Sequence, residues 1–477
     1  MRPAFDEGFT FHDVLLVPRR SSVASRKDVS LSGRVSRNIV LKVPIVSANM
    51  DTVTESAMAI AMARIGGLGI IHRFLTIEEE AEEVAYVKRA ESFVIENPYT
   101  LFPYQTVKEA KHFMERHGVG GLLVINDNRK LIGVVSMRDV IFNGKSDTAV
   151  AEVMSKKLIT AKPGIALEKA EDLLRKHKIE KLPLVDDNGR VRGLITAQDI
   201  QKLKRYPHAT KDPKGRLLVG AAVGVVGDYL ERGEALVAAG VDLLVVDVAH
   251  GHADHVIAAV KKLKARWPKL DVVAGNVATY EGARDLARAG ADGIKVGVGP
   301  GSTCTTRIVT GAGVPQLSAV LDCARITRER GIPVIADGGL RDSGDMTKAL
   351  AAGASCVMVG SLLGGCDESP GSTVTRKGMK YKVYRGMASL GATLSRRAKE
   401  SGREVSGEAA AELIPEGVET VMPYRGLVSE VVGQLVGGVR SGFSYCGART
   451  LAELWKKAKF IRITQASWAE SRPHAVE

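Results

Sequence analysis

The sequence predicts an α/β protein whose fold class is a (β/α)8 TIM barrel with an inserted module of two repeats. Three observations predict this fold: eight short apolar runs rich in Val and Ile, helical patterns between most of them, and one long interval that holds two similar motifs. Short runs of this kind are typical of buried parallel strands, and eight β/α units favour a closed barrel. A doubly wound open sheet is the alternative, although it would not need eight strands.

The barrel strands are predicted at the apolar runs, with helical patterns such as 253–267 and 279–290 between them. In chain order the runs are 44–50, 67–72, 217–223, 243–249, 272–278, 293–299, 333–339 and 356–361. A barrel built from these runs would occupy residues 1–92 and 205–477, on either side of the inserted module.

Polar residues cluster where the predicted strands end. Active sites of TIM barrels lie on this face, and phosphates often bind the loops after the seventh and eighth strands. Here those loops read "DGG" (337–339) and "GS" (360–361), so their backbone N–H groups can approach an anion without interference from side chains. The clustered residues are Ser47 to Asp51, Asp247, Asn276, Gly299 to Cys304, Asp337 to Gly339, Gly360 and Ser361.

The interval between the second and third strands is too long for one crossover and contains an internal repeat. The segments "GVVSMRDV" (133–140) and "GLITAQDI" (193–200) lie sixty residues apart, and each copy fits a β-α-β-β-α unit. The repeat resembles a tandem CBS pair, expected at 93–150 and 151–204. That resemblance implies an adenine or guanine nucleotide bound through its ribose or phosphates, and a purely structural module is the alternative. The residues implied are Ser136, Asp139, Thr196 and Asp199.

Composition limits the partners and the compartment that we expect. The net charge is +13, but the basic residues are scattered and only 5% of residues are aromatic, which argues against a nucleic-acid partner. No apolar run approaches a membrane span, so no membrane partner is expected. The acidic N-terminal stretch has no apolar core for a signal peptide. The five cysteines form no CxxC pair, and their odd number argues against a disulfide framework. We therefore expect a cytoplasmic protein.

Cys304 lies in the stretch "GVGPGSTCTTRIVTG" (297–311), among glycines, hydroxyls and a proline. A core cysteine usually lies among Val, Leu and Ala, whereas this loop could close its backbone around a ligand. A thiolate in such a loop is a candidate nucleophile. The other four cysteines are in helix, strand or unmatched contexts, where packing is the expected role. They are Cys323, Cys356, Cys366 and Cys446.

Six motifs in the same chain resemble the IMP dehydrogenase/GMP reductase family, over nearly the whole length. They are "SANMDTVTE" (47–55), "AGNVAT" (274–279), "GVGPGSTCTTR" (297–307), "ADGG" (336–339), "VMVGS" (357–361) and "YRGMASLGA" (384–392). The resemblance implies that Cys304 attacks C2 of a purine nucleotide, which splits a difficult redox step into two easier ones.

The same resemblance implies roles for residues at matching positions. Cys304, Thr306 and Glu416 would be catalytic, and Asp247 and Asn276 would contact the nicotinamide cofactor. Backbone carbonyls of Gly299, Gly301 and Cys304 would hold K⁺. Where the family commonly has a glycine after the methionine of "RGM", this chain has Ala388. The residues implied for the purine nucleotide monophosphate are Ser47, Met50, Ser302, Asp337, Gly339, Gly360, Ser361, Tyr384, Gly386, Met387 and Gly417. A homotetramer or homo-octamer is also implied.

The family performs two reactions, and the flap expected at about 392–417 bears on the choice. Its dehydrogenases activate a water with an Arg-Tyr pair, which converts IMP to XMP with NAD. This flap has Arg396, Arg397 and Arg403 but no tyrosine, and none occurs between Tyr384 and Tyr424. An arginine stays protonated near neutral pH, so it is a poor base by itself.

The sequence favours GMP reductase with NADPH, and IMP dehydrogenase with NAD is the alternative. In the reductase, Thr306 and Glu416 would relay a proton to the departing ammonia. Segments 315–324 and 459–465 are also similar to reductases. In contrast, 50–55, 307–316, 367–371 and the CBS insertion are more similar to dehydrogenases. A third hypothesis is a catalytically inactive nucleotide sensor, against which the intact Cys304, Thr306, Asp337 and Glu416 argue.

Overall fold

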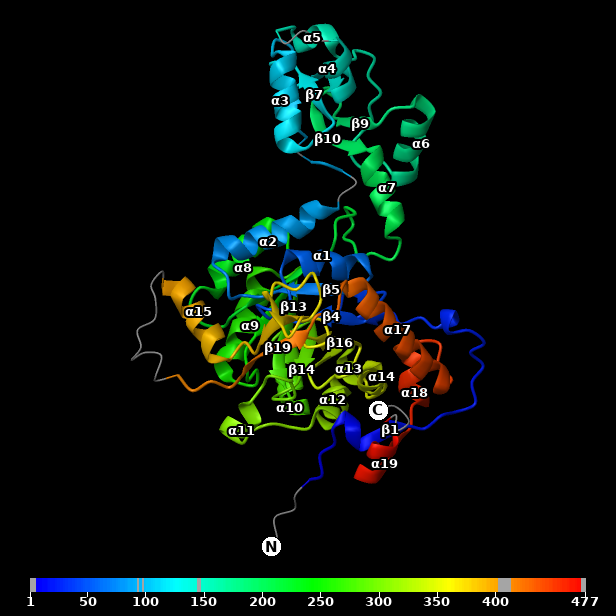
Figure 1. Ribbon diagram of the computed structural model, residues 1–477, viewed down its shortest axis with the longest axis vertical. Coiled ribbons are helices and arrows are strands. Elements are labelled where there is room, and N and C mark those ends of the chain that lie inside the picture. The colour runs from blue at the N-terminus through cyan, green and yellow to red at the C-terminus, as the bar shows by residue number, and fades with distance from the viewer. Residues whose placement is uncertain (1–5, 92–93, 97, 144–146, 402–412, 473–477) are drawn as a thin grey trace. The chain divides into compact units, whose positions relative to one another are not determined.

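A computed structural model describes residues 6–91, 94–96, 98–143, 147–401 and 413–472 (Figure 1). The chain folds into two compact units. The first comprises Met1–Ala90, His208–Asp212 and Leu217–Glu477, and the second comprises Glu91–Pro207 and Pro213–Arg216. The short segment at 208–212 belongs to the first unit because Thr210 donates its amide to the Ala63 carbonyl at 2.8 Å and its hydroxyl to the Gly67 carbonyl at 2.9 Å.

The first unit contains a closed barrel of eight parallel strands. Their hydrogen-bonded order is β11-β12-β13-β14-β15-β16-β4-β5, and β11 pairs back with β5. This closure confirms the predicted TIM barrel and excludes the open sheet, and each predicted apolar run overlaps one of the strands. The strands are β4 (Ile45–Ser47), β5 (Leu68–Ile71), β11 (Gly220–Val223), β12 (Leu243–Asp247), β13 (Asp271–Val277), β14 (Gly293–Val296), β15 (Val334–Asp337) and β16 (Cys356–Val359).

The barrel strands lie between a packed interior and a layer of outer helices, which explains their almost uninterrupted apolar runs. Every residue of β5, β11, β14 and β16 is buried. Helices begin where capping residues allow: Thr279 accepts a bond from the Gly282 amide and starts α10. The outer helices are α1 (Ser56–Arg64), α2 (Ile77–Ala90), α8 (Tyr229–Ala239), α9 (Asp254–Arg266), α10 (Tyr280–Arg288), α12 (Gln316–Cys323), α13 (Arg325–Arg330) and α14 (Ser343–Ala351).

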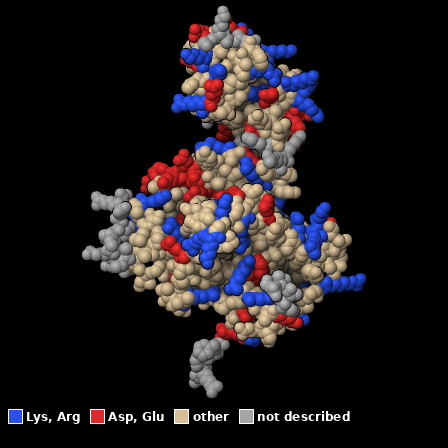
Figure 2. Space-filling view, in the orientation of Figure 1, with Lys and Arg blue, Asp and Glu red and all other residues tan. Residues whose placement is uncertain are grey.

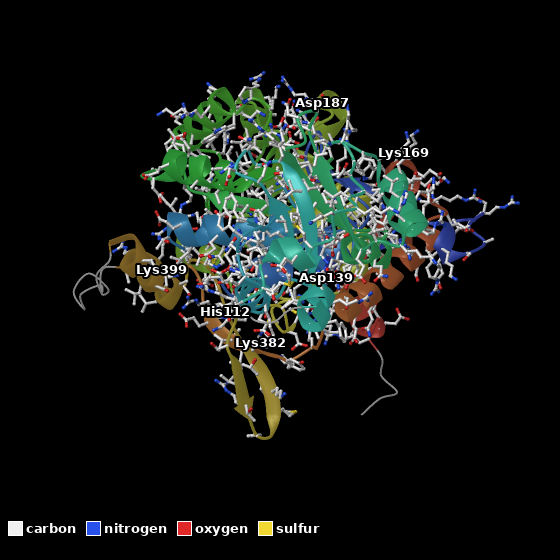
Figure 3. All side chains as sticks on the ribbon, turned by 90° about the horizontal axis from the view of Figure 1, so that it is seen from above. His112, Asp139, Lys169, Asp187, Lys382 and Lys399 are labelled. Atoms are coloured by element: carbon white, nitrogen blue, oxygen red, sulfur yellow. The ribbon has the colours of Figure 1, made fainter. Side chains whose placement is uncertain are left out.

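Additional elements of the first unit extend beyond the barrel. An antiparallel sheet joins β17 (Thr373–Arg376), β18 (Met379–Arg385) and β19 (Glu419–Pro423), and the β17–β18 hairpin projects clearly in Figure 3, with Lys382 near its base. Near the chain ends, β1 (Val14–Leu16) pairs with β20 (Phe460–Arg462). The remaining elements are η1 (Phe11–Asp13), η2 (Arg26–Asp28), β2 (Gly33–Arg34), β3 (Val40–Leu41), α11 (Thr306–Thr310), α15 (Leu390–Ser401), α17 (Val428–Tyr445), α18 (Leu451–Lys457) and α19 (Gln465–Glu470).

The second unit contains the two repeats. The first copy has the order β-α-β-β-α: β6 (Thr100–Leu101), α3 (Val107–His117), β7 (Gly121–Ile125), β8 (Leu131–Ser136) and α4 (Met137–Asn143). The second has α6 (Leu167–His177), β9 (Lys181–Val185), β10 (Val191–Thr196) and α7 (Ala197–Arg205), and its first strand is reduced to one bridge between Ala161 and Leu184. The short α5 (Val150–Val153) lies between the copies in sequence. Each copy has its own apolar cluster.

On the face shown in Figure 2, Lys and Arg side chains are interspersed with Asp and Glu, and acidic side chains gather over α2, whose first turn carries Glu78, Glu79 and Glu80. In the part of the chain that the structure describes, no helix combines the length and the apolar character needed to cross a bilayer.

Candidate active site

A cavity of about 430 Å³ opens at the C-terminal ends of the barrel strands. Its lining draws on the ends of several strands: Met50 follows β4, Asp247 ends β12, and Asp337 ends β15. The structure thus brings together polar residues that are far apart in the sequence. The predicted site residues in the lining are Met50, Asp247, Asn276, Gly299, Gly301, Cys304, Thr306, Asp337, Tyr384, Gly386, Met387 and Glu416.

The cysteine lies at the start of a chain of hydrogen bonds. The Cys304 thiol donates to the Thr306 hydroxyl at 3.1 Å, and that hydroxyl donates to Glu416 Oε2 at 2.7 Å. Thr306 and Glu416 are 110 residues apart in the sequence. A hydroxyl can donate and accept at once, so this arrangement can move a proton between the carboxylate and a group beside the sulfur.

The backbone fixes this arrangement by pairing the cysteine loop with the end of the flap. The Thr305 amide donates to the Glu416 carbonyl at 2.9 Å, and the Val418 amide donates to the Thr303 carbonyl at 2.9 Å. A side chain at Gly417, which is not in the cavity lining, would lie 3.3 Å from the Thr303 carbonyl oxygen. The predicted residue Gly417 therefore sits directly behind the site, where the two segments approach closely.

Arg307 holds the glycine-rich start of the loop. Its Nε donates to the Val298 carbonyl at 3.1 Å and its Nη2 to the Val314 carbonyl at 2.5 Å. Gly299 has φ +78° and packs against this side chain, because a Cβ at Gly299 would lie 2.6 Å from Arg307 Cγ. Glycine fits this position because it has no Cβ, so it adopts the positive φ without strain and leaves room for the Arg307 side chain.

Exposure distinguishes Cys304 from the other cysteines. Cys304 is half-buried at the cavity, whereas Cys323, Cys356, Cys366 and Cys446 are buried. Burial raises the pKa of Cys366 to about 12, and it raises the pKa of Cys356 further above its ordinary range. Thiols of this kind do not ionise near neutral pH, so among the five cysteines Cys304 has the surroundings that a nucleophile needs.

A buried lysine organises the opposite wall of the cavity. Lys295 on β14 has a side chain only 3% exposed, and its Nζ lies 3.0 Å from Asp337 Oδ2 and 3.6 Å from Asp247 Oδ1. It also donates to Asn276 Oδ1, and Asn276 Nδ2 donates to Asp337 Oδ2 at 2.9 Å. Burial alone would lower the pKa of Lys295, but Asp337 and Asp247 outweigh it, and the net direction is upward. Lys295 therefore stays cationic and fixes both carboxylates.

Several predicted residues lie around Tyr384 rather than in the cavity lining. Burial raises the pKa of Tyr384, although hydrogen bonds with Ser302 and Thr303 act in the opposite direction, so its phenol remains a donor. A Cβ at Gly360 would lie 3.0 Å from the Tyr384 hydroxyl, and Ser361 follows Gly360 after β16. Gly339 has φ +75° and packs against Pro300. Of the residues predicted to bind a phosphate, Ser302 and Gly360 thus lie beside this buried phenol.

The predicted residue Ser47 is not in the cavity lining. It is fully buried at the end of β4 and accepts a hydrogen bond from the Thr54 hydroxyl at 2.9 Å. Four residues further along the chain, Asp51 accepts two bonds from Arg385, at 2.9 Å and 2.5 Å, and the Asp51 amide lies 3.2 Å from Met387 Sδ. These contacts tie the loop after β4 to the segment that contains Gly386 and Met387.

A family model, the IMP dehydrogenase / GMP reductase domain, matches residues 8–474. The chain belongs to the IMP dehydrogenase/GMP reductase family. This membership confirms the resemblance found in the six motifs, and it makes the protein an oxidoreductase of purine nucleotides.

Relatives in the family carry both names. Two curated relatives are inosine-5'-monophosphate dehydrogenases: that of Nitrosopumilus maritimus is 55% identical over 472 residues (99% of this chain, 99% of that protein), and that of Aquifex aeolicus is 54% identical over 474 residues (99% and 96%). A solved cysteine-to-alanine variant of GMP reductase from Trypanosoma brucei, in complex with guanosine 5'-monophosphate, is 47% identical with a TM-score of 0.91 over 99% of each chain. GMP reductase from the same organism in complex with guanosine 5'-triphosphate is 43% identical with a TM-score of 0.79 (97% of this chain, 99% of that chain).

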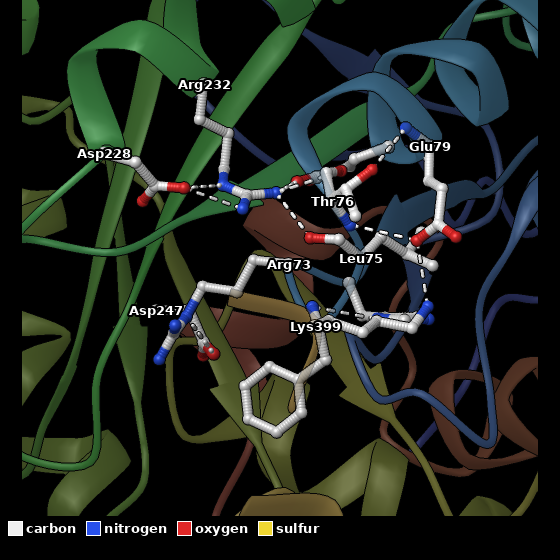
Figure 4. Close-up of polar contacts among 11 residues, drawn as sticks. Arg73, Leu75, Thr76, Glu79, Asp228, Arg232, Asp247 and Lys399 are labelled. Carbon is white, nitrogen blue, oxygen red and sulfur yellow. Dashed lines mark hydrogen bonds and ion pairs between the residues drawn. The ribbon is translucent and has the colours of Figure 1, made fainter. Parts of the chain in front are cut away.

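The family's flap is described in part. Helix α15 carries Arg396, which lines the cavity, and Arg397. Arg403 lies outside the described residues. Lys399 on α15 forms an ion pair with Glu79 on α2 at 2.9 Å, which fastens this helix to the barrel (Figures 3 and 4).

The donor set predicted for K⁺ consists of backbone carbonyls. Carbonyl oxygens are the ligands that select K⁺ in other proteins. The Gly301 carbonyl accepts the Cys304 amide at 3.1 Å and keeps a second lone pair, so this predicted donor can still contact a monovalent cation. In the part of the chain that the structure describes, no cluster of three His, Cys, Asp or Glu side chains could hold a metal ion.

The predicted nucleotide residues of the inserted unit bond within their own motifs. The Ser136 hydroxyl donates to Asp139 Oδ2 at 2.7 Å, and the Thr196 hydroxyl donates to Asp199 Oδ2 at 2.5 Å. Thr196 also caps α7 by accepting the Asp199 amide. Ser136 and Asp139 line a cavity of about 570 Å³ together with Lys157, Lys178 and Lys181, whereas Thr196 and Asp199 are not in that lining.

The sequence analysis missed Lys295, Arg73 and Phe74, which belong to the cavity lining. Lys295 interrupts the apolar run 293–299, and a charge inside a buried strand was the signal that could have found it. Arg73 and Phe74 follow β5 and line the cavity near Asp247, at the same strand end as other polar residues. The prediction did not extend the clustered polar residues to this loop.

Proposed function

We propose that this protein is a GMP reductase, which converts GMP to IMP and ammonia with NADPH through a covalent adduct on Cys304. The observation that carries the proposal is a cavity with the Cys304–Thr306–Glu416 chain of hydrogen bonds but a flap without tyrosine. The chain of hydrogen bonds can deliver a proton to an amine that leaves the purine. The flap lacks the tyrosine of the Arg-Tyr pair with which dehydrogenases of the family activate water. The similar Trypanosoma brucei reductase, solved with guanosine 5'-monophosphate, supports this choice.

The first step forms a bond between the Cys304 sulfur and C2 of the purine. As the C2–N bond breaks, the 2-amino group needs a proton to leave as ammonia. Glu416 can supply it through the Thr306 hydroxyl, because these groups already lie 2.7 Å apart. The carbonyl of Thr303 and the amide of Val418 keep the relay beside the sulfur.

The second step returns the sulfur to the enzyme. When bound, the reduced nicotinamide supplies a hydride to C2, and the C2–S bond breaks to release IMP and the Cys304 thiolate. Asp247 and Asn276 would orient the cofactor, since both line the cavity beside Lys295. The orphaned Nε of Arg73, which is buried and lacks a hydrogen-bond partner among the described residues, fits a cofactor that carries phosphates.

The nucleotide itself would bind between two parts of the site. Asp337, held by Lys295 and Asn276, presents acceptor oxygens to the ribose hydroxyls. The phenol of Tyr384, with Ser302, Gly339, Gly360 and Ser361, would hold the monophosphate, and the backbone of Gly386 and Met387 would face the base. With the ribose, the phosphate and the base held in this way, C2 of the purine would lie over the Cys304 sulfur, as a near-attack geometry requires.

IMP dehydrogenase with NAD is the second candidate. Relatives named inosine-5'-monophosphate dehydrogenase, 55% and 54% identical over nearly the whole chain, favour it. It would require a base that activates water without the family's tyrosine.

The proposal has three further parts. The carbonyls of Gly299, Gly301 and Cys304 would bind K⁺, and the chain would assemble as a homotetramer or homo-octamer. A guanine or adenine nucleotide would bind at Ser136 and Asp139.

The deciding experiment follows absorbance at 340 nm with two substrate mixtures. The mixture of GMP and NADPH should lose absorbance as NADPH is oxidised, and it should release ammonia. The mixture of IMP and NAD should show little change in absorbance. The Cys304→Ala variant should lose turnover by about 10⁴-fold or more, as removal of a nucleophile usually does, while it still binds GMP.

Three results would contradict this proposal in different ways. XMP formed from IMP and NAD at a comparable rate would assign the dehydrogenase reaction. Retained turnover in Cys304→Ala would overturn the covalent mechanism. No turnover in either mixture, with GMP still bound by the parent protein, would favour the inactive sensor.

A further inference from the structure

We infer that Gln316 is a positioning residue, which fixes the separation between the loop that carries Cys304 and the carboxylate of Asp337. This inference rests on the proposed function. Gln316 is the first residue of α12, and its exposed fraction is only 2%. It is not in the cavity lining, so it acts through other residues rather than on a ligand. None of the roles proposed above uses it.

The side-chain amide of Gln316 joins the ends of two neighbouring barrel strands. Its Nε2 donates to the Val296 carbonyl at 2.8 Å and to the Asp337 carbonyl at 3.0 Å. Val296 is the last residue of β14, and Asp337 is the last residue of β15. Because both partners are acceptors, the atom between them must be the nitrogen of the amide and not its oxygen.

These two hydrogen bonds hold β14 and β15 together beyond the end of their own ladder. The last Cα partners in the register of the two strands are Val296 and Ala336. Gly297 then begins the cysteine loop, and a Cβ at this glycine would lie 2.1 Å from the Asp337 carbonyl oxygen and 3.1 Å from Gln316 Nε2. The two backbones therefore approach closely at this point, and the glutamine amide bonds to both.

The two strand ends lead to the groups whose separation matters for the first chemical step. The loop after β14 carries Cys304, and Asp337 presents its carboxylate to the cavity. Asn276 joins the same two segments, since its Nδ2 donates to the Gly297 carbonyl at 2.8 Å and to Asp337 Oδ2 at 2.9 Å. Misplacement of reacting groups by about 1 Å can lower a rate about 100-fold. Gln316 thus helps to set where the sulfur lies relative to a ribose held by Asp337.

The acceptor side of Gln316 indicates that its donors are what this position requires. Gln316 Oε1 is buried with no hydrogen-bond partner among the described residues, and an unpaired buried acceptor costs stability. An apolar side chain of similar size would avoid that cost, but it would lose the bonds to the Val296 and Asp337 carbonyls. Packing alone therefore does not explain a glutamine here.

Steady-state kinetics of Gln316→Met tests the role, because this substitution keeps the size of the side chain and removes both hydrogen bonds. With GMP and NADPH, kcat should fall about 100-fold while the KM for GMP changes less than about threefold. Leu317→Val on the same helix is the matched control, since Leu317 is also buried. The control should lower the thermal unfolding temperature but leave kcat unchanged. If Gln316→Met does not fold, Gln316→Glu replaces it, since it keeps the shape and can donate at most one hydrogen bond.

A second measurement does not require turnover. Alkylation of Cys304 by iodoacetamide is followed by mass spectrometry with and without saturating GMP. In the parent protein, bound GMP should shield the sulfur. Gln316→Met should still bind GMP but lose this protection by about fivefold or more, because the base no longer lies over the thiol.

The outcomes separate this inference from the proposed function. If kcat and protection in Gln316→Met were within twofold of the parent, or if Leu317→Val lost as much, the positioning role would be wrong. A raised KM with unchanged kcat would also overturn it, since Gln316 would then serve binding alone. If the parent oxidises IMP with NAD instead, the same variants are measured in that reaction, and a retained loss of kcat keeps the role of Gln316 while the reductase assignment fails. Absence of protection in the parent would count against the purine site itself.

Discussion

The barrel rim and the inserted unit use the same kinds of polar residue in opposite ways. At the rim, Asp337 contacts Lys295 and Asn276, which come from two other strands. In the inserted unit, Ser136 bonds to Asp139 and Thr196 bonds to Asp199, three residues away in each motif. Contacts between distant segments create a preorganised site, whereas contacts at this short spacing start a helix.

The difference teaches how to weigh a polar motif in a sequence. A hydroxyl followed three residues later by a carboxylate satisfies the first turn of a helix by itself, and this structural role needs no ligand. The motif of the first repeat lines a cavity together with three lysines from residues 151–204, whereas the motif of the second repeat is not in that lining. Substitutions in the two regions should therefore have effects of different size and kind.

The largest effect is expected from Lys295→Met. The substitution leaves Asp247 and Asp337 without the cation between them, and removal of one partner from a buried pair costs about 3 kcal/mol or more. Because both carboxylates are about one-fifth exposed, we expect the lower end of that range. Urea unfolding followed by circular dichroism measures it, with exposed Lys261→Met on α9 as the matched control. Equal midpoints for both variants would refute the role of Lys295.

A smaller effect is expected from Thr306→Val, which keeps the size of the side chain but removes the hydroxyl between Cys304 and Glu416. Turnover of GMP should fall about 100-fold, the lower end for loss of acid–base assistance, and Thr306→Ser should recover most of it. The KM for GMP should change little, since the hydroxyl serves proton transfer. If Thr306→Val and Thr306→Ser had the same turnover, the relay would be wrong.

The smallest effects are expected in the inserted unit. Thr196→Ala and Ser136→Ala should each lower the stability of that unit by about 1 kcal/mol, because each removes a hydroxyl that satisfies the first turn of a helix. Added GTP should raise the thermal unfolding temperature of the parent and of Thr196→Ala but not of Ser136→Ala, since only Ser136 lines the cavity. An identical response of the two variants would show that the repeats do not differ in this way.

Particular residues show where prediction from sequence succeeded and where it stopped. Runs such as 243–249 predicted barrel strands because parallel strands buried on both faces must be apolar throughout. Cys304 was found because its loop composition is unlike that of a core cysteine. Arg73 was missed as a residue of the cavity lining because its ion pair joins it to Asp247 on a distant strand, and nothing in "HRF" specifies that neighbour.

The sequence by itself determined the barrel, the repeated insertion, the family and the candidate nucleophile, because periodicity and local motifs carry that information along the chain. Only the tertiary structure decided which polar groups meet. It placed Thr306 against Glu416 across 110 residues, and it enclosed Lys295 between two carboxylates. The physical reason is that hydrogen bonds and charge pairs depend on distances of a few ångströms, and those distances exist only after the barrel has closed.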